Sequence, residues 1–210
     1  MKSFFSFLFI LSISPTAFAE ATVQDLQHGW AIANYQTVDD NVKPSLMRLI
    51  EQAESAVTAN PNDPELLIWQ GIINSTYAGK AGAFGGALGF LKAARASLEK
   101  AIEIDDMAMA GSAYTSLGAL YYQVPGWPIA FGNNKKARSY LEKALTINPD
   151  GLDSNYFYGD FLYEEREYAD AKQVLNKALN AAPRPGRELA DQGRRDEIKT
   201  LLVKIDKKLG

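Results

Sequence analysis

Residues 171–183 read AKQVLNKALNAAP, and this run carries the pattern from which the architecture of the chain can be inferred. The runs ARSYLEKALTINP at residues 137–149 and ARASLEKAIEIDD at residues 94–106 place Ala, Leu and Ala at the same intervals, and a weaker copy lies at residues 49–61. Because residues three and four apart share one face of a helix, each run is predicted to be an amphipathic helix. The last two copies lie 34 residues apart, and this recurrence predicts a repeat array.

The recurring run and the segment before it resemble the tetratricopeptide repeat, a pair of antiparallel helices A and B. Leu117-Gly118 and Gly159 stand where helix A requires a small residue, which lets helix B approach closely. Tyr114 and Asn155 replace the signature Trp of helix A in the two later repeats. The resemblance covers residues 45–183 and implies an all-α, right-handed superhelix (solenoid) of antiparallel helix pairs.

The chain as a whole is similar to a group of exported bacterial tetratricopeptide proteins. This similarity rests on residues 111–118 (GSAYTSLG), on Pro125-Gly126-Trp127-Pro128, on residues 155–159 (NYFYG) and on Arg184-Pro185-Gly186-Arg187. It implies the fold and an exported location. It implies no activity, so no catalytic residue is transferred from it.

The first residues have the pattern of a secretory signal. Lys2 is followed by an apolar run at residues 4–13, and Ala17-Phe18-Ala19 forms a small-residue cleavage site. This pattern predicts a signal peptide at residues 1–19, cleaved after Ala19, and therefore an exported, periplasmic protein if the source is Gram-negative. The apolar run is too short to cross a bilayer comfortably, and no second long apolar run follows, so no transmembrane segment is expected in the mature chain.

The mature chain divides into three parts by pattern and composition. A single amphipathic helix is expected before the repeats, and a polar helix with one apolar stripe is expected after them as the cap that such arrays require. The predicted parts are an N-terminal helical segment at residues 20–44, tetratricopeptide-like repeats at residues 45–183 and a capping helix at residues 184–210.

Two repeats are longer than the common period, and the extra residues fall between their A and B helices. One predicted insert is the Gly-rich run at about residues 78–89, and the other is the Pro- and Gly-rich run at about residues 124–133. Inserts of this kind form loops at one edge of an array, often the edge that binds. Trp127 and Phe131 are expected to be buried, because large aromatic side chains are costly to leave in water.

Composition excludes several classes of function. The 210 residues carry a net charge of −3, so a broad basic surface for nucleic acid is not expected. The chain has no Cys and a single His, His28, which removes disulfides, thiolate metal sites, paired-His metal sites and a Ser-His-Asp triad. The Gly-rich run lacks both nucleotide-binding glycine motifs. We therefore expect a protein that is not an enzyme and that carries neither cofactor nor metal.

The concave face of such an array is formed by helix A side chains, and counting along the repeats predicts which ones they are. They mix aromatic, hydroxyl and acidic groups, which suits a peptide or a partner helix. The alternative is that the tyrosines are ordinary half-buried packing residues. The predicted partner-binding residues, with the two aromatic residues of the second insert, are Thr115, Tyr122, Trp127, Phe131, Tyr156, Asp160 and Tyr163.

Four arginines gather after the last repeat, among them Arg184 and Arg187. A guanidinium fork suits carboxylates and phosphates, so these two residues are candidates for contact with an anion. Asp191, Asp196 and Glu197 lie close by in the sequence. The alternative is therefore ion pairing within the protein, along the capping helix.

Two functions fit these features. The first is a scaffold that binds a protein or peptide partner on its concave face without catalysis. The second is a periplasmic small-molecule carrier or transport accessory protein, with a pocket of several hundred Å3 beneath the inserts. Self-association through the edges of the array remains open, and an enzyme is the least favoured reading because no catalytic constellation is present.

Overall fold

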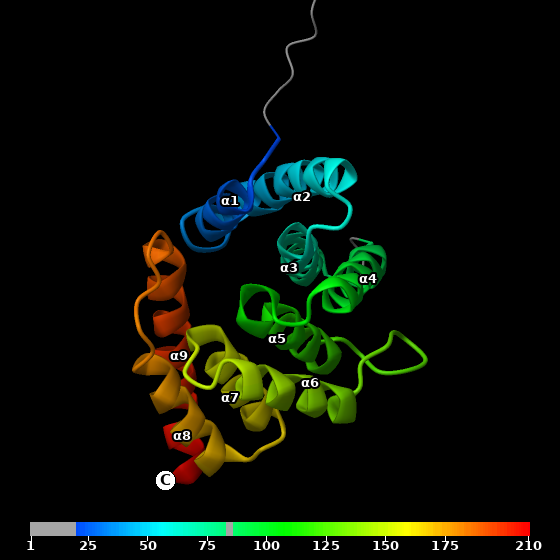
Figure 1. The fold of residues 1–210 in the computed structure, drawn as a ribbon. Helices are drawn as coiled ribbons and strands as arrows, with labels where there is room; N and C mark the ends of the chain where they lie inside the picture. The colour runs from blue at the N-terminus through cyan, green and yellow to red at the C-terminus, as the bar shows by residue number, and fades with distance from the viewer. Residues whose placement is uncertain (1–19, 83–85) are drawn as a thin grey trace, which may run out of the picture.

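The computed structural model describes residues 20–82 and 86–210, and within these residues all the regular structure is helical. Consecutive helices lie side by side and wind into a solenoid, as Figure 1 shows. The predicted all-α repeat fold is therefore confirmed, whereas the predicted signal peptide at residues 1–19 lies outside the described residues. The elements are α1 (Val23–Tyr35), a 3-10 turn (Asp39–Asn41), α2 (Val42–Ala59), α3 (Pro64–Ala81), α4 (Ala87–Ile104), α5 (Ala108–Gln123), α6 (Asn134–Ile147), α7 (Leu152–Glu164), α8 (Tyr168–Leu179) and α9 (Glu188–Leu209).

Helix pairs α3/α4, α5/α6 and α7/α8 are the A and B helices of three repeats. The Ala and Leu residues of the recurring run are buried on the B helices and face the A helix of the same repeat. Each A helix offers a glycine at the point of contact, because a Cβ there would collide with the B-helix leucine. The distances from that hypothetical Cβ to leucine Cγ are 2.6 Å for Gly71 and Leu98, 2.5 Å for Gly118 and Leu141, and 2.6 Å for Gly159 and Leu175.

Two predicted boundaries differ from those of the structure. Helix α2 begins at Val42 and not at Ser45, because Pro44 lies in its first turn, where no backbone N–H is needed. The predicted insert at residues 78–89 is mostly helix: residues 78–81 extend α3 and residues 87–89 begin α4. The extra length of this repeat therefore goes largely into longer helices rather than into a loop, and residues 83–85 lie outside the described part of the chain.

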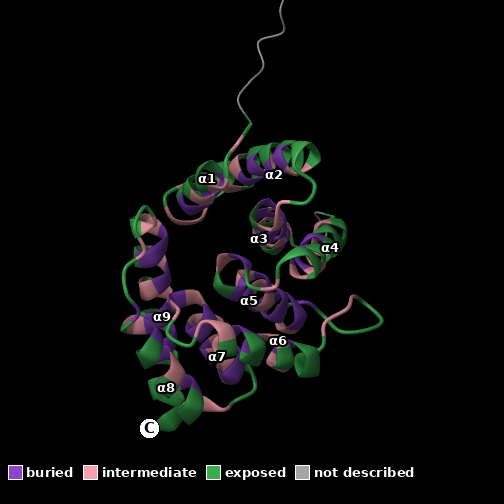
Figure 2. Ribbon diagram, in the orientation of Figure 1, coloured by how far each residue is buried: buried purple, intermediate pink, exposed green. Residues whose placement is uncertain are grey.

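The second insert, residues 124–133, is a loop between α5 and α6, and Figure 2 shows that it projects from the array. Backbone hydrogen bonds hold its base, from Gly132 N to Pro125 O at 2.9 Å and from Asn133 N to Tyr121 O at 2.8 Å. Phe131 packs edge-on against Tyr121 with ring centroids 5.7 Å apart. Trp127 is 90% exposed, so the expectation that it would be buried is wrong. Phe131 packs against Tyr121 at the base of the loop. Trp127 lies at the tip, where no described helix is close enough to bury it.

Helix α9 covers the end of the array and also closes it. Ile198, Leu201 and Ile205 join the core of the later repeats, as expected of a capping helix. The other end of α9 reaches back to α1: a Cβ at Gly193 would lie 2.4 Å from Tyr35 Cδ1. Figure 1 shows α1 and α9 on the same side of the inner helices α3, α5 and α7. Of the helices that the structure describes, none is long and apolar enough to cross a membrane.

Candidate functional site

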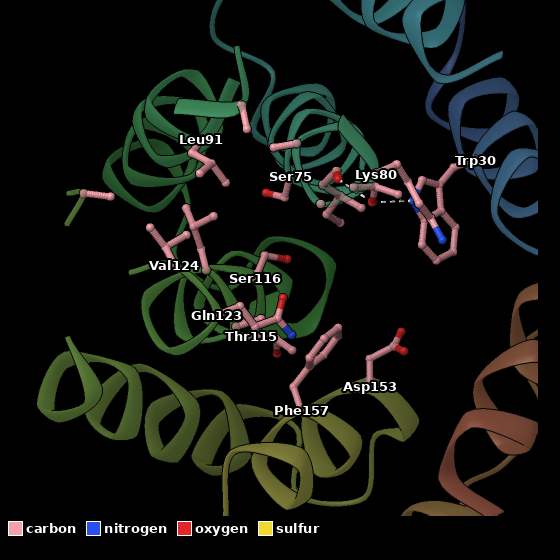
Figure 3. A pocket seen from close by; sticks show the side chains of 18 of the residues that line it. Trp30, Ser75, Lys80, Leu91, Thr115, Ser116, Gln123, Val124, Asp153 and Phe157 are labelled. Carbon is pink, nitrogen blue, oxygen red and sulfur yellow. Dashed lines mark hydrogen bonds between the residues drawn. The ribbon is translucent and has the colours of Figure 1, made fainter. Parts of the chain in front are cut away.

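The concave inner surface of the solenoid forms a partly open cavity of about 710 Å3 between α3, α4, α5 and α7. The loop at residues 124–130 bounds one end and residues of α1 and α9 bound the other, as Figure 3 shows in part. This volume lies within the range of about 300–1,000 Å3 that is typical of small-molecule sites. The residues that line it are Trp30, Trp69, Ile72, Ser75, Thr76, Ala78, Gly79, Lys80, Gly82, Ala87, Leu88, Leu91, Ser112, Thr115, Ser116, Ala119, Leu120, Gln123, Val124, Pro125, Ile129, Ala130, Asp153, Phe157, Arg187 and Arg194.

The repeat itself places the side chains of the cavity wall. Trp69, Ser116 and Phe157 each stand two residues before the contact glycine of their A helix, and all three line the cavity. Equivalent positions in successive repeats therefore point to the same interior space. The side chain at this position is large in α3 and α7 but small in α5. Open volume therefore remains beside Ser116.

The lengthened helices α3 and α4 supply a further wall. Ala78, Gly79 and Lys80 come from the extra turns of α3, and Leu88 and Leu91 come from the start of α4. The cavity thus owes part of its depth to the additional residues of this repeat. Residues of both predicted inserts line the cavity, although Trp127 and Phe131 are not among them.

Most polar groups of α3 at the cavity already have partners. The Ser75 hydroxyl donates to Gly71 O at 2.8 Å, and the Thr76 hydroxyl donates to Ile72 O at 2.8 Å. Trp30 Nε1 donates to Thr76 Oγ1 at 2.9 Å. These hydrogen bonds turn the hydroxyls back onto their own helix, so the wall they form is effectively apolar. In contrast, Trp69 Nε1 is buried and has no acceptor among the described residues.

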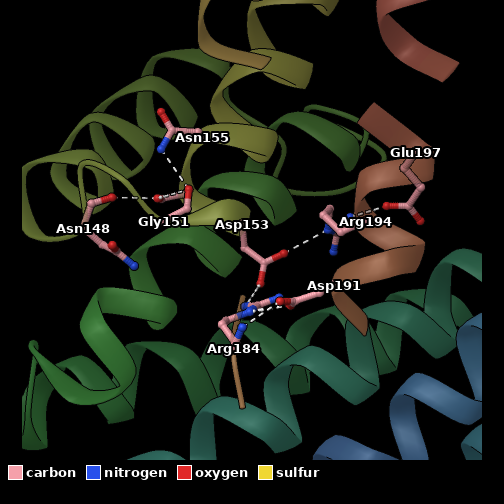
Figure 4. A network of polar contacts seen from close by, with 9 residues as sticks. Asn148, Gly151, Asp153, Asn155, Arg184, Asp191, Arg194 and Glu197 are labelled. Atoms are coloured by element: carbon pink, nitrogen blue, oxygen red, sulfur yellow. Dashed lines mark hydrogen bonds and ion pairs between the residues drawn. The ribbon is translucent and has the colours of Figure 1, made fainter. Parts of the chain in front are cut away.

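A network of charged side chains forms the wall near α9 (Figure 4). Asp153, at the start of α7, accepts from Arg184 Nη1 at 2.6 Å and from Arg194 Nε at 2.9 Å. Arg184 Nε also donates to Asp191 Oδ1 at 2.7 Å, and Arg194 Nη1 donates to Glu197 Oε2 at 2.5 Å. Asp153 therefore ties α7 both to α9 and to the segment that leads into it.

The network changes the proton affinity of its members. Burial alone would raise the pKa of Asp153, but the guanidinium groups of Arg194 and Arg184 outweigh it and hold the pKa well below its usual range. Burial opposes the charge of Arg194 as well, yet Asp153 keeps the pKa of Arg194 above its usual value. Arg194 also lies 4.2 Å from the centre of the Tyr156 ring. These groups stay ionised at neutral pH and act as a structural clamp.

Among the predicted site residues, Thr115 lines the cavity and is buried. Tyr122 and Asp160 contact each other: the Tyr122 hydroxyl donates to Asp160 Oδ2 at 2.6 Å. Burial, and then Asp160, raise the pKa of Tyr122 well above its usual value, so the phenol stays protonated. This pair joins α5 to α7, which means that the two side chains serve packing between repeats.

Tyr156 and Asp160 line a second, more open cavity of about 570 Å3 between α1, α7 and α9, together with Lys80. Tyr163 lies in neither cavity and packs against Tyr168, with ring centroids 5.6 Å apart. Apart from Thr115, the predicted partner-binding residues are therefore distributed between the second cavity, the interface between repeats and the outer loop.

Arg184 and Arg187 lie in different surroundings although only two residues separate them. Arg184 is engaged by Asp153 and Asp191, so ion pairing within the protein accounts for it. Arg187 lines the large cavity, and its guanidinium carbon lies 5.3 Å from the centre of the Trp69 ring. Within residues 20–82 and 86–210, no acidic side chain lies within ion-pair distance of Arg187, whereas its neighbours Arg184 and Arg194 are paired.

Sequence reasoning missed the contribution of α3, although a signal for it was present. Gly71 of α3 marks the same phase of the repeat as Gly118 of α5, so the positions of Thr115 and Tyr122 correspond to Ile68 and Ser75. Ser75 lines the cavity, whereas Ile68 does not, and Trp69 lies one position beyond the phase of the count. Arg187 carries no such signal, because it belongs to the segment after the repeats.

Residues 129–202 match the sequence model of the tetratricopeptide repeat, a span of about a third of the chain that includes α6, α7 and α8. This match supports the tetratricopeptide repeat superfamily, in keeping with the fold of the whole described chain. No curated protein matches the chain. Over residues 20–82 and 86–210, no group of three or more His, Asp or Glu side chains is placed to hold a metal ion.

Proposed function

We propose that this chain is a non-catalytic binding protein that takes an apolar small molecule into the cavity between α3, α4, α5 and α7. The observation that carries the proposal is the partly open cavity of about 710 Å3, lined mainly by aliphatic, aromatic and small side chains. Removing apolar surface of a ligand from water in such a space is favourable by about 25 cal/mol per Å2. Two of the hydroxyl groups on its wall, those of Ser75 and Thr76, do not compete with that gain, since they are bonded to their own helix.

The closure of the solenoid favours a small ligand over a long peptide. An open array presents a continuous groove in which an extended chain or a helix can lie. Here α9 packs against α1 through Gly193 and Tyr35, so the concave face is bounded at both ends. A compact molecule fits this space better than a peptide that must pass through it. Because we also propose export, on the pattern of residues 1–19, the ligand would be met outside the cytoplasm.

Filling the cavity tests the proposal. Gly79 lines the cavity, and within residues 20–82 and 86–210 no atom beyond the adjacent backbone of α3 lies within 4 Å of the position that its Cβ would occupy. Gly79→Phe is therefore expected to fold and to occupy the binding space. Gly89→Phe is the matched control, since Gly89 is equally unhindered but does not line the cavity. Mass spectrometry under non-denaturing conditions, on protein purified from its own host, should show a bound small molecule in the control and none in Gly79→Phe.

A second candidate function rests on a different feature, the outer loop. Trp127 is 90% and Ile129 72% exposed. Exposed aromatic residues are enriched where proteins bind other proteins, and tetratricopeptide repeats commonly mediate such contacts. We therefore propose, as the alternative, a scaffold that docks a protein partner through residues 124–133. A protein that co-purifies with the native chain but not with Trp127→Ala would favour this function over the first.

A further inference from the structure

The α9 end of the cavity holds two hydrogen-bond donors that lack acceptors within the described residues. Arg187 has no acidic partner, because Asp153 accepts from Arg184 and Arg194, and Asp191 accepts from Arg184. Trp69 is 2% exposed, and its indole N–H has no acceptor. The Trp69 N–H is covered by protein atoms, whereas Arg187 is half-buried and lines the cavity, so Arg187 is the cation that a ligand can reach.

The two donors lie together. The guanidinium carbon of Arg187 is 5.3 Å from the centre of the Trp69 ring, and both residues line the same cavity. Burial, and then the neighbouring charge of Arg184, lower the pKa of Arg187, but an arginine remains protonated in any protein environment. A second cation, Lys80, lines the cavity as well. Among the described residues of the wall, Asp153 is the only acidic side chain, and two arginines already neutralise it.

We propose that the ligand of this cavity is an amphiphilic carboxylate, whose anionic group accepts hydrogen bonds from the guanidinium group of Arg187. Its apolar part extends along the cavity wall towards Leu91 and Val124. A carboxylate has two oxygens that can accept two parallel hydrogen bonds from a guanidinium fork. This inference rests on the proposed function, because it requires the cavity to bind a small molecule.

Three probes with the same alkyl chain separate charge from apolar contact: octanoate, 1-octanol and octyltrimethylammonium. Their affinities for the full chain are measured by titration calorimetry at pH 7.5. We expect octanoate to bind about 10- to 100-fold more tightly than octanol, since charge-assisted hydrogen bonds contribute this much. The cationic probe should bind more weakly than octanol, because Arg187 and Lys80 repel it.

Two arginine variants locate the anion contact. Arg187→Gln should reduce the affinity for octanoate to that for octanol and leave the affinity for octanol unchanged. Its fold should be preserved, because Arg187 makes no side-chain cap to α9. Arg48→Gln, on the exposed surface of α2 and away from the cavity, should bind octanoate as the unmodified protein does. Unfolding curves that coincide for all three proteins establish that the difference is one of binding.

The outcomes distinguish a failure of the carboxylate inference from a failure of the proposed binding function. Equal affinities for octanoate and octanol, unaffected by Arg187→Gln but abolished by Gly79→Phe, would overturn the carboxylate inference while supporting the cavity as the binding site. Binding of none of the probes, or equal binding to the Gly79→Phe and Gly89→Phe variants, would overturn the proposed function and the inference with it.

Discussion

Gly118 of α5 and Leu141 of α6 are in such close contact that a Cβ on the glycine would lie 2.5 Å from the leucine Cγ. The same relationship recurs in the two other repeats, so it determines the distance between helices A and B throughout the array. These contacts position the A helices, whose inner faces line the cavity.

Replacing that glycine should therefore destabilise the protein. Gly118→Ala adds a methyl group where Leu141 and the backbone oxygen of Ala137 leave no room, and such overpacking costs about 1–3 kcal/mol. The higher helix propensity of Ala offsets at most about 1 kcal/mol of this loss. Chemical denaturation should show a lower free energy of unfolding, while Gly89→Ala, where nothing lies within 4 Å, should be neutral or slightly stabilising.

The charged network should make stability depend on pH in the acid range. Since the pKa of Asp153 is lower in the folded than in the unfolded state, the unfolded chain binds more protons below about pH 4. The stabilisation is therefore complete above about pH 5 and declines as the pH falls below 4. Denaturation midpoints at pH 6 and pH 3 should differ less for Asp153→Asn than for the unmodified protein. An equal pH response in both proteins would contradict this role.

The contact between Tyr122 and Asp160 should contribute to stability but not to ligand binding. Tyr122→Phe removes the hydroxyl that donates to Asp160 Oδ2 at 2.6 Å and leaves the carboxyl in a buried site without that donor. A loss of about 1–3 kcal/mol in the free energy of unfolding is expected. Because Tyr122 does not line the large cavity, the affinity for octanoate should be unchanged.

Trp127 offers a spectroscopic test of the site. Of the three tryptophans, Trp30 and Trp69 line the cavity, whereas Trp127 is exposed on the outer loop. Trp127→Phe should therefore remove the emission that acrylamide quenches most readily and change the free energy of unfolding by less than about 0.5 kcal/mol. In this variant, ligand binding should still alter the remaining fluorescence. Loss of the ligand-dependent signal would contradict the placement of the site.

The sequence predicts the helices well because each repeat is a local pattern. Ala and Leu at helical spacing specify the buried face of a B helix, and the glycine of helix A specifies how closely its partner packs. The run at residues 171–183 predicts a B helix, and most of this run lies in α8, at Tyr168–Leu179. These features depend on residues within one repeat, so a single sequence is sufficient to identify them.

The features that were missed depend on contacts between distant parts of the chain. Arg184 pairs with Asp153, 31 residues away, and no local pattern indicates that the two meet. Trp127 was expected to be buried on the grounds of its side chain alone, but burial also requires an opposing surface, which the loop tip lacks. The closure through Tyr35 and Gly193 joins the two ends of the chain and could not be inferred from any repeat.

That closure has a consequence for how the protein folds. In an open array each repeat contacts only its neighbours, so the ends fray and folding can spread from any point. The contact between α1 and α9 joins segments at the opposite ends of the described chain, and contacts of such long sequence separation form slowly. We expect the repeats to assemble first and α1 and α9 to meet last. A ligand that contacts Trp30 of α1 and Arg194 of α9 would stabilise this last contact, because the two residues lie on either side of it and both line the cavity.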